Sequence, residues 1–170
     1  MQITIRPWRE EYIPNLIKYA NNENVARNLR DLFPQPYTEE DAKTWIYFNK
    51  DLEPALNMAI ILNGEAIGGV GIMLKEDIHR KNAEIGYWVA ENYWGKGIAT
   101  QAARLMVEYT FTNFDVTRIY ASTFDYNVAS QRVLEKIGFV KEARLKKALF
   151  KNGRYVDEVI MSILKEDFIR

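Results

Sequence analysis

Three consecutive strand-like segments in the first half of the chain restrict its fold most. Residues 56–62 are almost wholly apolar, an Asn63-Gly64 pair follows, and apolar residues resume over 66–74. An Asn-Gly pair between two apolar runs is the strongest short-range signal for a β-hairpin. After a polar link, residues 82–89 again carry β-forming side chains. The pattern therefore predicts an antiparallel meander of three strands.

The chain that follows this meander alternates between helical and strand-like patterns. Apolar residues recur every three or four positions from Ile98 to Phe111, which is the period of a helix with one buried face. Gly138 stands where a left-handed residue usually ends a helix. The predicted order is helix, strand, helix and a final hairpin, at residues 98–111, 118–123, 127–137, 139–150 and 155–164.

The N-terminal third is predicted to form a short strand and helices. Residues 2–6 carry β-formers, and Pro7 is expected to stop strand pairing. Residues 13–20 have helical periodicity, and 25–30 form a plausible second helix. Thr38 is expected to cap a third helix. The buried face of that helix is predicted to consist of Ala42, Trp45 and Ile46.

Length and composition favour one compact α+β domain over residues 1–170 and exclude several kinds of site. A chain of 170 residues with 48% hydrophobic residues is long enough for a substantial core. It has no Cys and a single His, His79, so disulfides, cysteine nucleophiles and zinc clusters of thiolates or several histidines are excluded. We expect no metal site and interpret His79 as a solvated loop residue.

Charge and hydropathy restrict the partners. Lys+Arg and Asp+Glu are both 23, so the net charge is zero and does not favour nucleic acid. No segment approaches the roughly 20 apolar residues of a membrane span. A cytoplasmic protein that binds neither nucleic acid nor membrane is the expectation.

Two glycines before the predicted helix at Ile98 indicate an anion-binding turn. Gly95 and Gly97 permit close approach of the backbone to a ligand, and the amides at the helix N-terminus favour phosphate oxygens. A P-loop is excluded because its Gly-Lys-Ser/Thr ending is absent. A Rossmann turn is excluded because a third glycine is missing and the loop follows a meander.

A second motif makes the signal more specific. Asn127-Val128-Ala129-Ser130 opens a predicted helix that ends at Gly138-Phe139. Together with the glycine turn, this motif resembles the GNAT superfamily of acyl-CoA-dependent N-acyltransferases. The run at residues 84–88 and the Asn-Gly-Arg-Tyr turn at 152–155 are similar to the ribosomal-protein-alanine N-acetyltransferase branch. The resemblance covers nearly the whole chain and implies a mixed, mostly antiparallel seven-stranded sheet with helices on both faces.

The resemblance also implies an activity and a set of site residues. An acetyl group would pass from acetyl-CoA directly to a primary amine, with no metal. Glu84 would be the base, acting through water, and Ser130 would stabilise or protonate the departing thiolate. Asn127 would bind the pantetheine arm, and the main chain at Val89 would polarise the thioester. The diphosphate would bind the main chain at Trp94, Gly95, Lys96, Gly97, Ile98, Ala99 and Thr100.

The chain departs from the family pattern at two positions. Trp94 stands where the family motif has Gln or Arg, and Leu134 stands where many members have a Tyr that protonates the thiolate. The site residues also have structural interpretations. Asn127 is equally placed to cap a helix, Ser130 to pack as a small residue, and Glu84 to be an exposed glutamate or a structural acceptor.

Amine basicity favours an N-terminal α-amine as the acceptor. At pH 7, deprotonating an α-amine of pKa 7.7–8.0 costs about 1–1.4 kcal/mol, against about 4.6 kcal/mol for a lysine-like amine. A polyamine, an aminoglycoside or another small amine remains an alternative, as does a CoA-binding regulatory module without turnover. The oligomeric state is expected to be a monomer or a homodimer.

Overall fold

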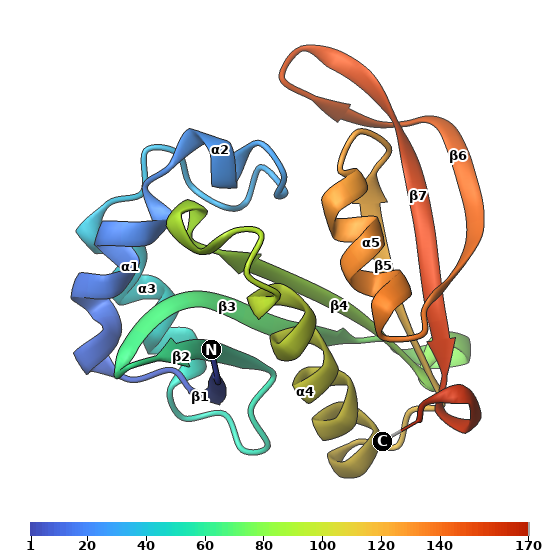
Figure 1. The fold of residues 1–170 in the computed structure, drawn as a ribbon, viewed down its shortest axis with the longest axis horizontal. Helices are drawn as coiled ribbons and strands as arrows, with labels where there is room; N and C mark the ends of the chain where they lie inside the picture. The colour runs from blue at the N-terminus through green and yellow to red at the C-terminus, as the bar shows by residue number, and fades with distance from the viewer. Residues whose placement is uncertain (170) are drawn as a thin grey trace. The chain divides into compact units, whose positions relative to one another are not determined.

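The computed structural model describes residues 1–169 and contains the alternation that the sequence predicts (Figure 1). The strands are β1 (Thr4–Pro7), β2 (Asn57–Leu62), β3 (Glu65–Leu74), β4 (Asn82–Val89), β5 (Arg118–Phe124), β6 (Val140–Lys151) and β7 (Arg154–Leu164). The α-helices are α1 (Ile13–Ala20), α2 (Glu23–Ala26), α3 (Glu39–Asn49), α4 (Ile98–Asn113) and α5 (Val128–Lys136). Four short 3₁₀ helices are η1 (Glu10–Tyr12), η2 (Asp77–His79), η3 (Glu91–Tyr93) and η4 (Lys165–Asp167).

The seven strands form a mixed sheet in the order β1-β2-β3-β4-β5-β7-β6. The pairs β1/β2, β2/β3, β5/β7 and β6/β7 are antiparallel, whereas β4 and β5 are parallel. The parallel register joins Asn82–Glu84 of β4 to Arg118–Tyr120 of β5. A mostly antiparallel seven-stranded sheet with helices confirms the predicted α+β class.

The chain divides into two compact units. The first consists of Met1–Gly71 and Tyr87–Ala102, and the second of Ile72–Gly86 and Ala103–Arg170. That residues 1–170 form one domain stays a prediction.

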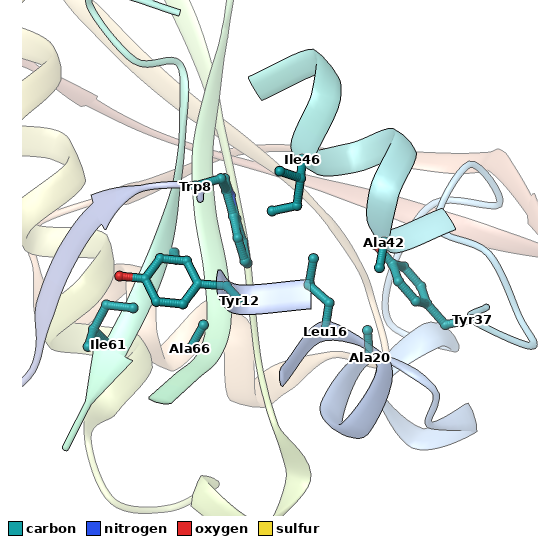
Figure 2. Close-up of a cluster of buried hydrophobic side chains, with 10 residues drawn as sticks. Trp8, Tyr12, Leu16, Ala20, Tyr37, Ala42, Ile46, Ile61 and Ala66 are labelled. Atoms are coloured by element: carbon teal, nitrogen blue, oxygen red, sulfur yellow. The ribbon is translucent and has the colours of Figure 1, made fainter. Parts of the chain in front are cut away.

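The core of the first unit lies where α1 and α3 pack on β2 and β3 (Figure 2). Leu16 and Ala20 of α1 are buried at the helical spacing that the sequence predicts, and Trp8 of the same cluster is 1% exposed. The buried residues of this cluster are Trp8, Tyr12, Leu16, Ala20, Tyr37, Ala42, Ile46, Ala59, Ile61 and Ala66.

Helix α3 begins with a reciprocal cap. The Thr38 hydroxyl accepts a hydrogen bond from the Asp41 amide at 3.2 Å, and the Asp41 carboxylate accepts one from the Thr38 amide at 2.7 Å. This confirms the predicted N-cap. Ala42 and Ile46 are buried as predicted, but Trp45 is 36% exposed and covers the edge of Trp8, with ring centroids 6.3 Å apart. The prediction of a buried Trp45 is therefore wrong.

Two N-terminal boundaries also differ from the predictions. Pro7 is the last residue of β1 and is in register with Met58, because β1 is an edge strand where a missing N–H is tolerated. The second helix begins at Glu23 rather than near Val25, since the Asn22 side chain accepts bonds from two backbone amides and so caps it earlier.

In the second unit, one face of β5 and β7 is buried. Exposure alternates along β5, with Ile119, Ala121 and Thr123 buried and the residues between them half-buried. Helix α5 ends at Gly138, which has a φ of +103°, as the sequence predicts. Among residues 1–169 no helix is both long and apolar enough to cross a membrane. The same residues include no group of three or more His, Asp or Glu positioned for a metal ion.

Candidate active site

The loop over residues 94–100 has the backbone that its glycines predict. Gly95 and Gly97 adopt φ of +74° and +76°, a region that residues with a Cβ rarely enter. A Cβ added at either position would meet nothing within 4 Å. The glycines are therefore required by the backbone conformation, and the space beside them is open to a ligand.

The first backbone amides of α4 lie directly after these glycines. The first hydrogen bond of the helix runs from the Gln101 amide to the Gly97 carbonyl at 3.1 Å. The amides of Ile98, Ala99 and Thr100 come before it, so no helical carbonyl accepts from them. Ile98 is 1% exposed and anchors this end of the helix. Several donors and the positive end of the helix dipole thus lie beside open space, which suits phosphate oxygens.

Side chains close the turn that leads into this loop. The Trp94 indole Nε1 donates to the Val89 carbonyl at 2.7 Å, and Lys96 Nζ donates to the Asn92 carbonyl at 2.9 Å. Trp94 stands where the family motif has a polar residue, and here its ring nitrogen fixes the end of β4 to the start of the loop. No local sequence pattern indicates this bond, because the turn conformation decides it.

Glu91 in η3 links the same turn to α2, a contact that the sequence analysis missed. Its two carboxylate oxygens accept from the side-chain amides of Asn22, at 2.8 Å, and Asn24, at 2.9 Å. These hydrogen bonds hold the pKa of Glu91 below its usual value. Asn22 also caps the start of α2, so this one residue bonds to both α2 and η3.

Aromatic residues connect the loop before α3 to the end of β4. The Phe33 ring contacts Trp88 and Tyr37, with centroids 5.6 Å and 5.3 Å apart. Burial raises the pKa of the Tyr37 hydroxyl to about 12, so it stays protonated at neutral pH. This cluster gives the first unit an apolar wall beside β4.

In the second unit, Lys75 and Tyr120 hold the carboxylate of Glu84 in place. Its Oε2 accepts from Lys75 Nζ at 2.8 Å and from the Tyr120 hydroxyl at 3.2 Å, and its side chain is 11% exposed. Burial lowers the pKa of Lys75, but the bonds to Glu84 and the nearby Tyr120 hydroxyl outweigh it and raise that pKa above its usual value. Glu84 is thus a fixed and largely covered carboxylate, which is compatible with a base and with a structural acceptor.

Asn127 and Ser130 adjoin each other at the start of α5. The Asn127 Oδ1 accepts from the Ser130 amide at 3.2 Å, so Asn127 is the N-cap of this helix. Capping uses the carbonyl oxygen and leaves the Nδ2 donors, which bond to no group among residues 1–169. Leu134 and Ile137 of the same helical face are buried. The structural role of Asn127 and a ligand role are therefore compatible.

The predicted site residues fall into two groups. Val89 and residues 94–100 belong to the first unit, and Glu84, Asn127 and Ser130 belong to the second. In the first unit Trp94 contacts Val89, and in the second Asn127 and Ser130 adjoin each other at the start of α5. Glu84 lies instead beside Tyr120, near the start of β5. Their roles toward a ligand stay predictions.

A comparison with protein families decides the family. The model of the acetyltransferase (GNAT) domain matches residues 2–140. The chain belongs to the GNAT acetyltransferase family. This confirms the resemblance found in the sequence, and the chain is accordingly a GNAT N-acetyltransferase.

Relatives of this GNAT chain differ in the acceptors that their names state. The uncharacterized N-acetyltransferase YnaD of Bacillus subtilis is 30% identical over 167 residues, which are 98% of this chain and 93% of YnaD. The ribosomal L7/L12 α-N-protein acetyltransferase RimL, solved with coenzyme A, matches with a TM-score of 0.83 and 25% identity over 96% of this chain and 94% of RimL. The Vibrio cholerae spermidine N-acetyltransferase, solved with CoA and spermine, matches with a TM-score of 0.80 and 25% identity over 99% of both chains.

Proposed function

We propose that this GNAT enzyme transfers the acetyl group of acetyl-CoA directly to a primary amine, with a protein or peptide N-terminal α-amine as the preferred acceptor. The observation that carries the proposal is the 94–100 loop, where two glycines at positive φ border open space and the first amides of α4 follow directly. Oriented backbone donors of this kind fit a diphosphate. Acetyl-CoA is a co-substrate with this group, and relatives have been solved with CoA.

Each remaining site residue has a chemical task in this proposal. The main-chain N–H at the strand end around Val89 donates to the thioester carbonyl and polarises it. The Asn127 Nδ2 group donates to the pantetheine arm. The amine nitrogen forms a bond to the carbonyl carbon, and the carbon–sulfur bond breaks. Glu84 receives the amine proton through water, and Ser130 donates a hydrogen bond or proton to the thiolate. Direct attack is the route proposed because the chain has no Cys to carry an acyl group.

The α-amine preference follows from the cost of freeing the lone pair. An α-amine of pKa 7.7–8.0 needs about 1–1.4 kcal/mol at pH 7, which a modest base can supply. Polyamines and aminoglycosides stay alternatives, and so does a module that binds CoA without turnover. A monomer or homodimer in the cytoplasm, with no nucleic-acid partner, stays a prediction.

Release of free thiol tests the proposal. The protein is incubated with acetyl-CoA and a panel of amines, including N-terminal peptides, spermidine and an aminoglycoside, and free CoA is measured. We expect peptide-dependent thiol release and a peptide product heavier by one acetyl group. Acetyl-CoA without an amine is the control. If CoA raises the melting temperature but no amine releases thiol, the chain is a binding module and the proposal is wrong.

A further inference from the structure

A second carboxylate lies on the half-buried face of β5 and β7. Phe124 of β5 is in register with Glu158 of β7, so the two residues share a face, and Ser122 and Tyr120 share it by strand alternation. The Ser122 hydroxyl donates to Glu158 Oε1 at 2.5 Å. This bond fixes the carboxylate and uses one of its two oxygens.

Glu158 differs from the nearby Glu84 and Glu142 because, among residues 1–169, it forms no ion pair. Glu84 pairs with Lys75 and Glu142 pairs with Arg118. Among residues 1–169 no Lys, Arg or His nitrogen lies within ion-pair distance of Glu158. A half-buried carboxylate without a counter-charge attracts a cation from outside.

Aromatic rings adjoin this carboxylate. Phe124 stacks on Tyr126, with ring centroids 5.1 Å apart and planes at 4°. The Arg154 guanidinium lies 5.7 Å from the centroid of the Tyr126 ring and forms a cation–π contact with it. A fixed carboxylate oxygen, a serine hydroxyl and an aromatic ring together form the kind of surface that binds an organic ammonium group.

The place of Glu158 along the sheet separates it from Glu84. Glu84 is in register with Tyr120, and Glu158 with Phe124, four residues further along β5. Four residues of strand span about 13 Å. One ammonium group cannot contact both carboxylates.

We propose that Glu158, Ser122 and Phe124 form a subsite for a positively charged amine of the acceptor, distinct from the amine that is acetylated. The inference rests on the proposed function and narrows its substrate class to acceptors with a second cationic group. A polyamine and a peptide with a lysine close to its N-terminus share this chemistry. Glu158 here is a specificity residue that contacts the acceptor.

Binding to the isolated protein tests the subsite without turnover. The dissociation constants of spermidine, of an N-terminal alanine peptide with lysine at its third position, and of the same peptide with norleucine are measured by calorimetry for wild type and Glu158→Gln. The glutamine oxygen still accepts from Ser122, so the variant is expected to fold. We expect a loss of about tenfold or more for one cationic ligand and none for the norleucine peptide. The cationic ligand whose affinity falls is the one that the subsite recognises, a polyamine or a lysine-containing peptide.

Two further variants control for charge and for fold. Glu166→Gln on η4 removes the same charge from an exposed position and should leave every dissociation constant unchanged. Glu158→Asp keeps the charge and should retain more affinity than Glu158→Gln. If Glu158→Gln binds spermidine and the lysine peptide as wild type does, or if wild type binds neither, the subsite is refuted. Wild type that binds a cationic ligand but releases no thiol would instead refute the proposed function alone.

Discussion

Glu84 sits in a chain of polar contacts that fixes its position on β4. Lys75 and Tyr120 both donate to the same carboxylate oxygen, Oε2. These two bonds hold the carboxylate in one orientation on β4. The ion pair between Lys75 and Glu84 is largely covered. Removing either partner should therefore lower the free energy of unfolding more than the loss of a surface salt bridge would.

Replacing Glu84 tests its proposed role as the base. Glu84→Gln keeps the hydrogen-bonding shape but cannot accept a proton, so kcat/KM for a peptide acceptor should fall by about a hundredfold. Initial rates of thiol release measure it. Glu142→Gln, which changes a glutamate on β6 bonded to Arg118, is the control and should stay within a few-fold of wild type. Wild-type kcat/KM in Glu84→Gln would show that Glu84 is a structural acceptor.

Side-chain caps determine where helices α2 and α3 of the first unit begin. Thr38 and Asp41 satisfy each other's backbone amides at the start of α3. Asn22 caps α2 while its amide bonds Glu91 in η3. Caps of this kind set where the flanking loops begin, and therefore where the Phe33 and Trp88 contact forms.

The cap at Thr38 is expected to stabilise α3. Thr38→Ala removes the exposed cap hydroxyl and should lower the free energy of unfolding by about 1 kcal/mol, as measured by urea denaturation. Thr44→Ala makes the same change at an exposed interior position of the same helix. There alanine is the better helix former, so stability should stay the same or rise by less than about 0.7 kcal/mol. Equal losses in both variants would contradict the cap.

The contact between η3 and α2 predicts a pH dependence. The pKa of folded Glu91 is lowered from 4.5 by Asn22 and Asn24, so its stabilisation is complete above about pH 4.5 and is lost as pH falls through the lowered value. Glu91→Gln should melt at a lower temperature than wild type at pH 7, and the gap should narrow below about pH 4. Thermal melts across this range measure it. A gap that is constant with pH would mean that the carboxylate charge plays no part.

At the scale of the whole molecule, local signals and long-range contacts differ in what the sequence reveals. The Asn63-Gly64 turn, the Thr38 cap and the end of α5 at Gly138 depend on a few adjacent residues, and all three were predictable. The partners of Glu91 lie 67 and 69 residues away in the chain, so no local pattern indicates them. Trp45 has helical spacing typical of burial, yet only the packing around Trp8 decides its exposure.

The candidate site divides in the same way. The glycines of the 94–100 loop were predictable because the backbone conformation requires them. The pairing of Lys75 with Glu84 and the missing counter-charge at Glu158 were not, since both depend on which strands lie side by side. The motif therefore locates the glycine loop, and the sheet register adds the charged groups at Glu84 and Glu158.

Calorimetric titration with coenzyme A tests the central claim, that backbone amides at residues 94–100 bind the diphosphate. Wild type should bind CoA saturably, and Gly97→Ala should weaken binding about tenfold or more, because φ of +76° becomes strained and a methyl group enters the open space. Gly64→Ala carries the same backbone strain at φ of +84° in the β2–β3 turn and should bind CoA as wild type does. Absence of CoA binding to wild type, or equal affinity in all three proteins, would contradict the account.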